Sequence, residues 1–146
     1  MTEMTNIDGS LAVCAGQMTA AGRKSSNEDC IGIRTPEGLP LTFKGVAAVI
    51  ADGVSSAEAG REASESCVQS FLADYYSTPD SWTVETSAKA VLTALNRWLY
   101  SRSHRATEAH RGYVSTLSAL VLKSHTAYLF HVGDSRIYRL RDGFLE

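Results

Sequence analysis

The sequence lacks the features that mark several large classes of protein. Its 146 residues contain only three prolines and 11 glycines, which excludes collagen-like and low-complexity chains. No apolar run approaches the roughly 20 residues that a membrane span needs, and the longest, residues 46–51, has the length of a strand. The N-terminus carries acidic residues in place of a basic segment leading into an apolar stretch, so we expect no signal peptide.

Cysteine is also scarce. Cys14, Cys30 and Cys67 are an odd number and include no Cys-x-x-Cys pair. This favours buried thiols in a reducing compartment over a disulfide framework or a thiolate zinc site. With no signal peptide expected either, we predict a cytoplasmic protein.

There is no large excess of charge of either sign. The 14 basic and 16 acidic residues give a net charge of -2, which argues against a broad affinity for nucleic acid. The charge is uneven, however, with 9 acidic and 5 basic residues in 1–65 against 7 and 9 in 66–146. The first half therefore has the charge for a local acidic site.

The remaining composition is that of a globular protein, with 44% hydrophobic and 21% charged residues. A chain of this length can bury one substantial core. We expect a flexible N-terminus at residues 1–9 and one domain unit over 10–146.

Short apolar runs predict strands, and one of them, residues 45–51, is continuous enough to be buried on both faces. Asp142 and Gly143 predict a hairpin turn at the end of the chain, because this pair readily adopts positive φ. The predicted strands are residues 11–18, 31–34, 45–51, 117–122, 127–132 and 137–140.

Two helices are predicted between the strands. Ser55 and Glu58 have the spacing of a capping box, in which each side chain accepts from the other residue's backbone N–H. Apolar residues follow at helical spacing, and a second helix is predicted over 83–104. The core-facing residues are Ala63, Cys67, Val68, Phe71, Leu72 and Tyr75 in the first helix, and Ala88, Val91, Leu92, Leu95, Trp98 and Leu99 in the second.

Three polar clusters stand at predicted strand ends: residues 27–29 (Asn-Glu-Asp), 52–53 (Asp-Gly) and 133–136 (Gly-Asp-Ser-Arg). Taken singly, each is also typical of a solvated turn. Converging carboxylates would instead supply the hard oxygen ligands that Mg²⁺ and Mn²⁺ prefer. Two such ions can activate a water molecule and clamp a phosphoryl group.

The order of these clusters resembles the metal-dependent PPM/PP2C family of protein serine/threonine phosphatases. The likeness covers residues 15–146, and Ser115-Thr116 and the block at 131–138 belong to it. It is also similar to the phosphatase half of bacterial proteins that join this domain to a protein kinase. The resemblance implies an α+β fold, a β-sandwich of two antiparallel sheets flanked by helices.

The resemblance also implies residue roles. Asp52 would bridge two Mn²⁺ or Mg²⁺ ions as the central catalytic carboxylate, and Gly53 would offer its carbonyl to one of them. Glu28 would complete that ion's protein ligands, Asp29 would hold metal-bound water, and Asp134 would lie at an accessory third-metal position. Water would attack phosphorus in line, with no phosphoenzyme intermediate.

Three positions depart from the family pattern. Lys24 occupies the position of the phosphate-binding arginine, with Arg23 one residue earlier, so either could contact phosphate. Val54 replaces a histidine proposed as general acid in animal members, and Val114 replaces a glycine. The family's two further metal-binding aspartates come after this point in its pattern, so we expect the N-terminal portion of a phosphatase domain, incomplete at its C-terminus.

The expected function is removal of phosphate from phosphoserine and phosphothreonine in proteins, with a phosphoprotein substrate and a linked or cognate Ser/Thr kinase as partner. The portion in this chain could be inactive alone. The alternative is a non-catalytic phosphatase-like module that regulates or binds a partner.

Overall fold

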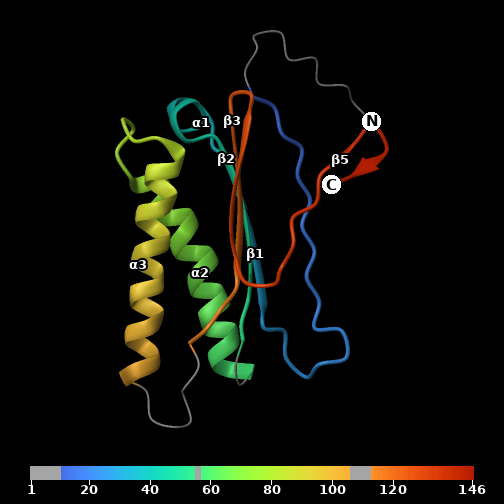
Figure 1. Cartoon of the computed structure of the whole chain (residues 1–146), viewed down its shortest axis with the longest axis vertical. Helices are drawn as coiled ribbons and strands as arrows, with labels where there is room; N and C mark the ends of the chain where they lie inside the picture. Colours follow the sequence, from blue (N-terminus) through green and yellow to red (C-terminus); the bar gives the residue numbers. More distant parts are fainter. Residues whose placement is uncertain (1–10, 55–56, 106–112) are drawn as a thin grey trace.

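The computed structural model describes residues 11–54, 57–105 and 113–146. Strands and helices alternate in an α+β order (Figure 1). The elements are β1 (Asp29–Arg34), α1 (Leu39–Lys44), β2 (Val46–Asp52), α2 (Ala57–Ser77), α3 (Val84–Arg105), β3 (Leu117–Lys123), β4 (Thr126–Val132), β5 (Leu140–Arg141) and β6 (Phe144–Leu145).

The first four strands form one sheet in the order β1-β2-β3-β4, and every pair in it is antiparallel. Helices α2 and α3 connect β2 to β3 and lie together on one face of this sheet (Figure 1). On the opposite side are the extended segment 11–28 and the chain from residue 133 onward, which ends in the separate β5–β6 ladder. The predicted antiparallel α+β class is confirmed by the four-stranded sheet and its helices, and β5 and β6 form a separate, exposed ladder.

The core lies between the sheet and the two helices, as the helical spacing predicts. It unites alternate residues of β2 and β3 with the apolar faces of α2 and α3. Its fully or nearly fully buried members are Ala47, Val49, Ala51, Cys67, Val68, Phe71, Tyr75, Val84, Ala88, Val91, Leu95, Leu117, Ala119 and Val121.

The other face of the sheet has no helix over it in the described residues. Ile50 of β2 is 43% exposed, and Leu129 of β4 is 59% exposed. The expectation that β2 is buried on both faces is therefore only half right, because helices cover the face of Ala47, Val49 and Ala51 alone.

Four other local expectations are wrong. Residues 11–18 form no strand, because no described segment pairs with them and a strand needs a partner for its backbone groups. Strand structure at 137–140 begins only at Leu140. Cys14 is exposed with this unpaired segment, and Trp98 is 40% exposed because it lies at the rim of the α3 interface.

Among the remaining local features, one predicted turn is confirmed, one helix was not predicted, and two predictions fall outside the described residues. The turn at Asp142 and Gly143 is confirmed, with φ values of 52° and 81° joining β5 to β6. Helix α1 was not predicted, because it has only six residues and its second residue, Pro40, lies within turn-like sequence. The capping-box serine, Ser55, and the N-terminal residues 1–9 lie outside the described residues.

Lys44, at the end of α1, is buried with only 1% of its surface exposed. Its ammonium group donates to the Thr78 hydroxyl at 2.8 Å, the Pro79 carbonyl at 2.8 Å and the Ser87 hydroxyl at 3.3 Å. Burial is the main cause that lowers the pKa of Lys44. Three neutral oxygens thus hold a charged group that joins α1 to the α2–α3 connection.

No helix in the described parts of the chain has the length and apolar character to cross a lipid bilayer.

Candidate active site

Asp29 and Asp52 stand directly opposite each other where β1 begins and β2 ends. Their neighbours Cys30 and Ala51 pack into the core on the helix side. Because side chains alternate along a strand, both carboxyl groups project from the face without helices. The antiparallel register therefore joins two of the three predicted acidic clusters.

The environment of Asp52 disfavours its charged form. Burial is the largest cause that raises the pKa of Asp52, followed by a hydrogen bond and the negative charge from Asp29 and by the charge of Asp134. The positive charge of Lys24 acts in the opposite direction. Residues from two other segments, 24–29 and the turn after β4, thus act on the carboxyl group of Asp52.

The backbone of Asp52 is held by the residues just before β3. The Asp52 N–H donates to the Thr116 hydroxyl at 3.1 Å, and the Thr116 N–H donates to the Asp52 carbonyl at 2.8 Å. The Ser115 hydroxyl also donates to that carbonyl at 3.0 Å, and the Val54 N–H donates to the Val114 carbonyl at 2.8 Å. The Ser115-Thr116 pair recognised in the sequence therefore fixes the backbone at Asp52.

Gly53 is required by the close approach of α2. A Cβ atom built at position 53 would lie 2.0 Å from the carbonyl oxygen of Gly60. Gly60 was not singled out from the sequence, although a glycine inside a helix costs about 1 kcal/mol relative to alanine and so hints at a packing role.

Glu28 is tied to the same turn by its backbone. Its carbonyl accepts from the Gly53 N–H at 3.1 Å and from the hydroxyl of Ser64 on α2 at 2.6 Å. Its side chain is only 14% exposed and pairs with the Lys24 ammonium at 3.7 Å. The buried Ser64 also escaped sequence analysis, where a small polar residue on the apolar face of a helix was the available signal.

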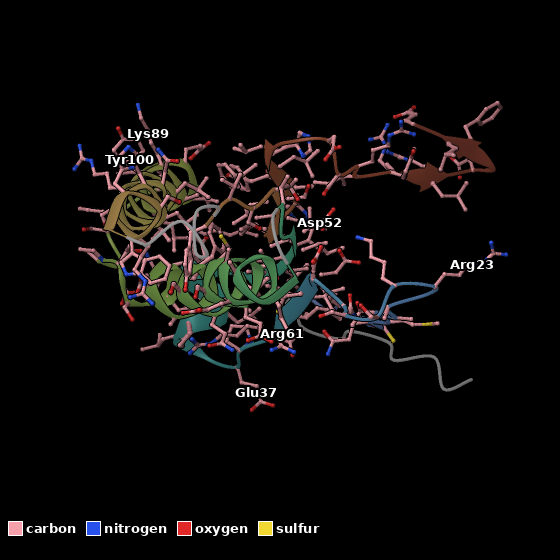
Figure 2. All side chains as sticks on the ribbon, turned by 90° about the horizontal axis from the view of Figure 1, so that it is seen from below. Arg23, Glu37, Asp52, Arg61, Lys89 and Tyr100 are labelled. Atoms are coloured by element: carbon pink, nitrogen blue, oxygen red, sulfur yellow. The ribbon has the colours of Figure 1, made fainter. Side chains whose placement is uncertain are left out.

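The structure separates the two candidate phosphate-binding residues. Lys24 contacts Glu28 and influences Asp52. Arg23 is exposed, and its side chain points outward, away from Asp52 (Figure 2).

Asp134 is exposed in the turn that follows β4. The next residue, Ser135, shares a hydrogen bond of 2.9 Å with the Thr116 hydroxyl, and this contact ties the turn to the end of β2. The His131 ring contacts the Ser118 hydroxyl through Nδ1 and the Gly133 carbonyl through Nε2, both at 2.9 Å.

Comparison with families of known proteins matches residues 19–146 to the model described as protein phosphatase 2C. The chain belongs to the protein phosphatase 2C family. Comparison with curated protein sequences gives no match.

Several solved structures share the fold. The serine/threonine phosphatase PstP/Ppp of Mycobacterium tuberculosis is 26% identical with a TM-score of 0.64, and the match covers 84% of this chain and 47% of that one. PppA, described as a key regulatory component of T6SS in Pseudomonas aeruginosa, is 26% identical with a TM-score of 0.61, covering 84% and 49%. The PPM Ser-Thr phosphatase MsPP of Mycobacterium smegmatis, in complex with cacodylate, is 21% identical with a TM-score of 0.60, covering 84% and 46%, and supports the fold alone. The chain spans about half the length of each of these structures.

Members of the protein phosphatase 2C family depend on divalent metal, generally Mn²⁺ or Mg²⁺. Within residues 11–54, 57–105 and 113–146, no three His, Cys, Asp or Glu side chains are grouped closely enough to hold a metal ion. The donor chemistry nevertheless fits, because Asp29, Asp52 and Asp134 bring hard oxygens and mutual repulsion that a divalent cation would neutralise.

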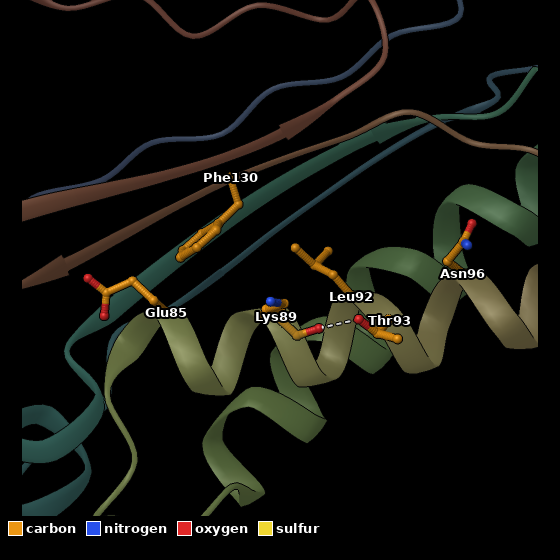
Figure 3. Close-up of a pocket in the computed structure, with 6 residues that line it drawn as sticks. All are labelled: Glu85, Lys89, Leu92, Thr93, Asn96 and Phe130. Carbon is orange, nitrogen blue, oxygen red and sulfur yellow. Dashed lines mark hydrogen bonds between the residues drawn. The ribbon is translucent and has the colours of Figure 1, made fainter.

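A hollow between α3 and β4 lies elsewhere in this protein phosphatase 2C chain (Figure 3). It has a volume of about 500 Å³ and includes none of the acidic residues discussed above. Its lining residues are Glu85, Lys89, Leu92, Thr93, Asn96 and Phe130. It is therefore separate from the candidate active site.

Proposed function

We propose that this chain carries the Glu28–Asp52 part of the active site of a metal-dependent protein phosphatase that acts on phosphoserine and phosphothreonine. The observation that carries the proposal is the register that places Asp29 directly opposite Asp52 at one end of the sheet. The negative charge of Asp134, in the turn after β4, also acts on Asp52. Family membership supports the reaction class.

The proposed metal ligands are the carboxylates of Glu28 and Asp52 and the carbonyl of Gly53, with Asp134 at an accessory site. When bound, the ions supply a water of lowered pKa and positive charge that stabilises the phosphoryl oxygens. Asp52 is the shared ligand, and its backbone is held in place by Ser115 and Thr116. Asp29, directly across the ladder, orients water by accepting hydrogen bonds.

Lys24 is the favoured phosphate-binding residue. Its ammonium group already lies beside Glu28, and its charge reaches Asp52. As a lysine it would bind phosphate as a point charge, without the two parallel hydrogen bonds of an arginine. Substitution of Lys24 by Met should raise KM for a phosphate ester more than substitution of Arg23 by Met.

The physiological substrate of this proposal is a phosphoprotein, and a linked or cognate Ser/Thr kinase is the proposed source of its phosphate. The proposed location is the cytoplasm, which the free cysteines Cys14, Cys30 and Cys67 support, because thiols stay reduced there. The match covers only about half the length of each of these solved structures. Full activity is therefore proposed to need further metal ligands from outside this chain.

The deciding experiment is hydrolysis of p-nitrophenyl phosphate by the full-length gene product with and without Mn²⁺. We expect activity that requires Mn²⁺ and falls at least about 100-fold in Asp52→Asn, because a ligand shared by two ions is lost. Asp142→Asn, an exposed turn residue, is the matched control and should leave activity unchanged. Activity without metal, or activity that survives Asp52→Asn, would contradict the mechanism.

A second candidate is a phosphatase-like module that binds a phosphoprotein without hydrolysing it. Lys24 in place of arginine and the lack of a grouped metal site in the described residues favour it. This module would bind a phosphoserine peptide and release no phosphate at any Mn²⁺ concentration.

A further inference from the structure

A cluster of four side chains lies where α2, α3 and the segment before β3 meet, and it includes none of the candidate metal ligands. Its members are Glu62, Trp98, Arg102 and Tyr113. The hydroxyl of Tyr113 donates to one carboxylate oxygen of Glu62 on α2. The other oxygen of Glu62 accepts from the guanidinium of Arg102 on α3 at 3.1 Å. Arg102 also lies over the rings of Trp98 and Tyr113, at 5.6 and 5.2 Å from their centroids.

Tyr113 is the buried member of this cluster. It is 6% exposed, whereas the side chains of Glu62 and Arg102 are each 48% exposed. Its ring meets the Trp98 ring edge to face at 6.3 Å, and its carbonyl accepts from the Ser103 hydroxyl at 3.3 Å. Tyr113 is thus held from its side chain and from its backbone.

The residues that follow Tyr113 are those that hold the backbone around Asp52. Val114 accepts from the Val54 N–H, and Ser115 and Thr116 both donate to the Asp52 carbonyl. Tyr113 therefore anchors one end of a four-residue segment whose other end fixes the candidate catalytic carboxylate.

Glu62, the α2 residue that accepts from the Tyr113 hydroxyl, is also close to the candidate active site. Glu62 lies two residues after Gly60, the residue whose backbone packs against Gly53. Helix α2 consequently contacts the Asp52–Gly53 turn directly and holds Tyr113 at the same time. A displacement of about 1 Å at a catalytic group can lower the rate on the order of 100-fold. Contacts that hold Asp52 in place are therefore expected to affect the rate.

We propose that Tyr113, through its hydrogen bond to Glu62 and its contact with Arg102, is a positioning residue that holds Asp52 in its working place. This inference rests on the proposed function for its catalytic meaning. The positioning itself is a property of the fold and can be measured without metal or substrate.

The test is amide hydrogen exchange of the chain, followed by NMR, in Tyr113→Phe. This variant keeps the ring and removes the single hydroxyl. We expect the amides of Val54 and Thr116 to exchange about fivefold to tenfold faster, as for the loss of one hydrogen bond that secures a local segment. The amides of Ile50 and Ser118, in the β2–β3 ladder, should change by less than about twofold.

Two further variants complete the test. Glu62→Ala, which removes the acceptor of the Tyr113 hydroxyl at a half-exposed position, should show the same local pattern if Tyr113→Phe does not fold. Tyr100→Phe, an exposed tyrosine on α3, is the matched control and should leave every amide unchanged. Equal acceleration of all sheet amides would indicate general stabilisation only, and unchanged exchange at Val54 and Thr116 would also overturn the proposal.

A second readout links positioning to the reaction. In the full-length gene product, Tyr113→Phe should lower kcat for p-nitrophenyl phosphate at least about fivefold with KM nearly unchanged, because binding groups are left in place. An unchanged kcat in an active enzyme would overturn the catalytic part. If the wild-type protein hydrolyses nothing, the proposed function fails while the exchange pattern still decides the positioning.

Discussion

Gly53 lies so close to Gly60 that no side chain fits between the end of β2 and the first turns of α2. A Cβ atom at position 53 would meet the Gly60 carbonyl oxygen at 2.0 Å, its carbonyl carbon at 2.3 Å and its Cα at 2.6 Å. All three atoms belong to backbone, so the clash cannot be relieved by rotating a side chain.

Gly53→Ala should therefore lower the free energy of unfolding by about 3 kcal/mol, the upper range for overpacking a well-packed site. Urea denaturation of the chain checks this value. Gly16→Ala is the matched control, because nothing lies within 4 Å of its built Cβ and its change should stay within about 0.5 kcal/mol. Equal stability of the two variants would contradict the packing argument.

Lys44→Met should destabilise the chain by about 1–3 kcal/mol, although it removes a buried charge. The Thr78 and Ser87 hydroxyls keep their mutual hydrogen bond of 2.8 Å. The Pro79 carbonyl loses the Lys44 donor and keeps the Trp82 N–H at 3.0 Å, so the cost comes from the three lost hydrogen bonds of a charged donor. Thermal unfolding measures the effect, with the exposed Lys89→Met as control. A variant as stable as the wild type would show that this buried lysine does not stabilise the connection between α2 and α3.

The raised pKa of Tyr76 predicts that the folded chain loses stability in alkali. Burial raises its pKa from 10.0 to about 12 in the folded chain. The folded state therefore keeps a proton that the unfolded state releases above pH 10, so stability is complete below pH 10 and falls as the pH rises towards 12. The contribution of this group at pH 11 is a loss of about 1.4 kcal/mol.

Denaturation by urea at pH 8 and pH 11 tests this prediction. Tyr76→Phe should be less stable than wild type at pH 8, because the hydrogen bond from Tyr76 to the Gly45 carbonyl at 2.7 Å is lost. It should also lose about 1.4 kcal/mol less between the two pH values. Tyr100→Phe, at an exposed position, should follow the wild type.

Asp52→Asn should stabilise the metal-free chain at pH 7 by about 0.5–1 kcal/mol, because like charges directly opposite in a ladder are destabilising. The variant still lacks the proposed shared ligand. Added Mn²⁺ should therefore raise the unfolding temperature of the wild type more than that of Asp52→Asn. Thermal unfolding in EDTA and in Mn²⁺ measures both effects, and Asp142→Asn, at an exposed turn position, serves as control. A destabilised Asp52→Asn in EDTA would argue against repulsion between Asp29 and Asp52.

The helices and the central strands could be predicted because their signals are periodic and local. Cys67, Phe71 and Tyr75 recur every fourth residue and are all buried. Residues 11–18 have strand-like composition, yet strand formation depends on a partner, which composition does not specify. Helix α1 is short, and its proline signals a turn as well as a helix start.

The candidate site shows the same division. Its acidic residues could be found in the sequence by their order and by the resemblance to a family. Their juxtaposition depends on register, which places Asp29 opposite Asp52. The supports were harder to foresee, because Ser64, Gly60 and Tyr113 act through contacts between residues far apart in the chain.

The connection between β2 and β3 has a consequence for folding. Both helices lie between these neighbouring strands, so the hydrogen bond from Asp52 to Thr116 joins residues 64 positions apart. Closing so long a loop is entropically costly and comes after local helix formation. A partly folded chain with intact helices would still lack the support around Asp52. Assembly of this end of the sheet therefore marks the late, cooperative stage of folding, and a cation bound there would favour the fully folded chain over its intermediates.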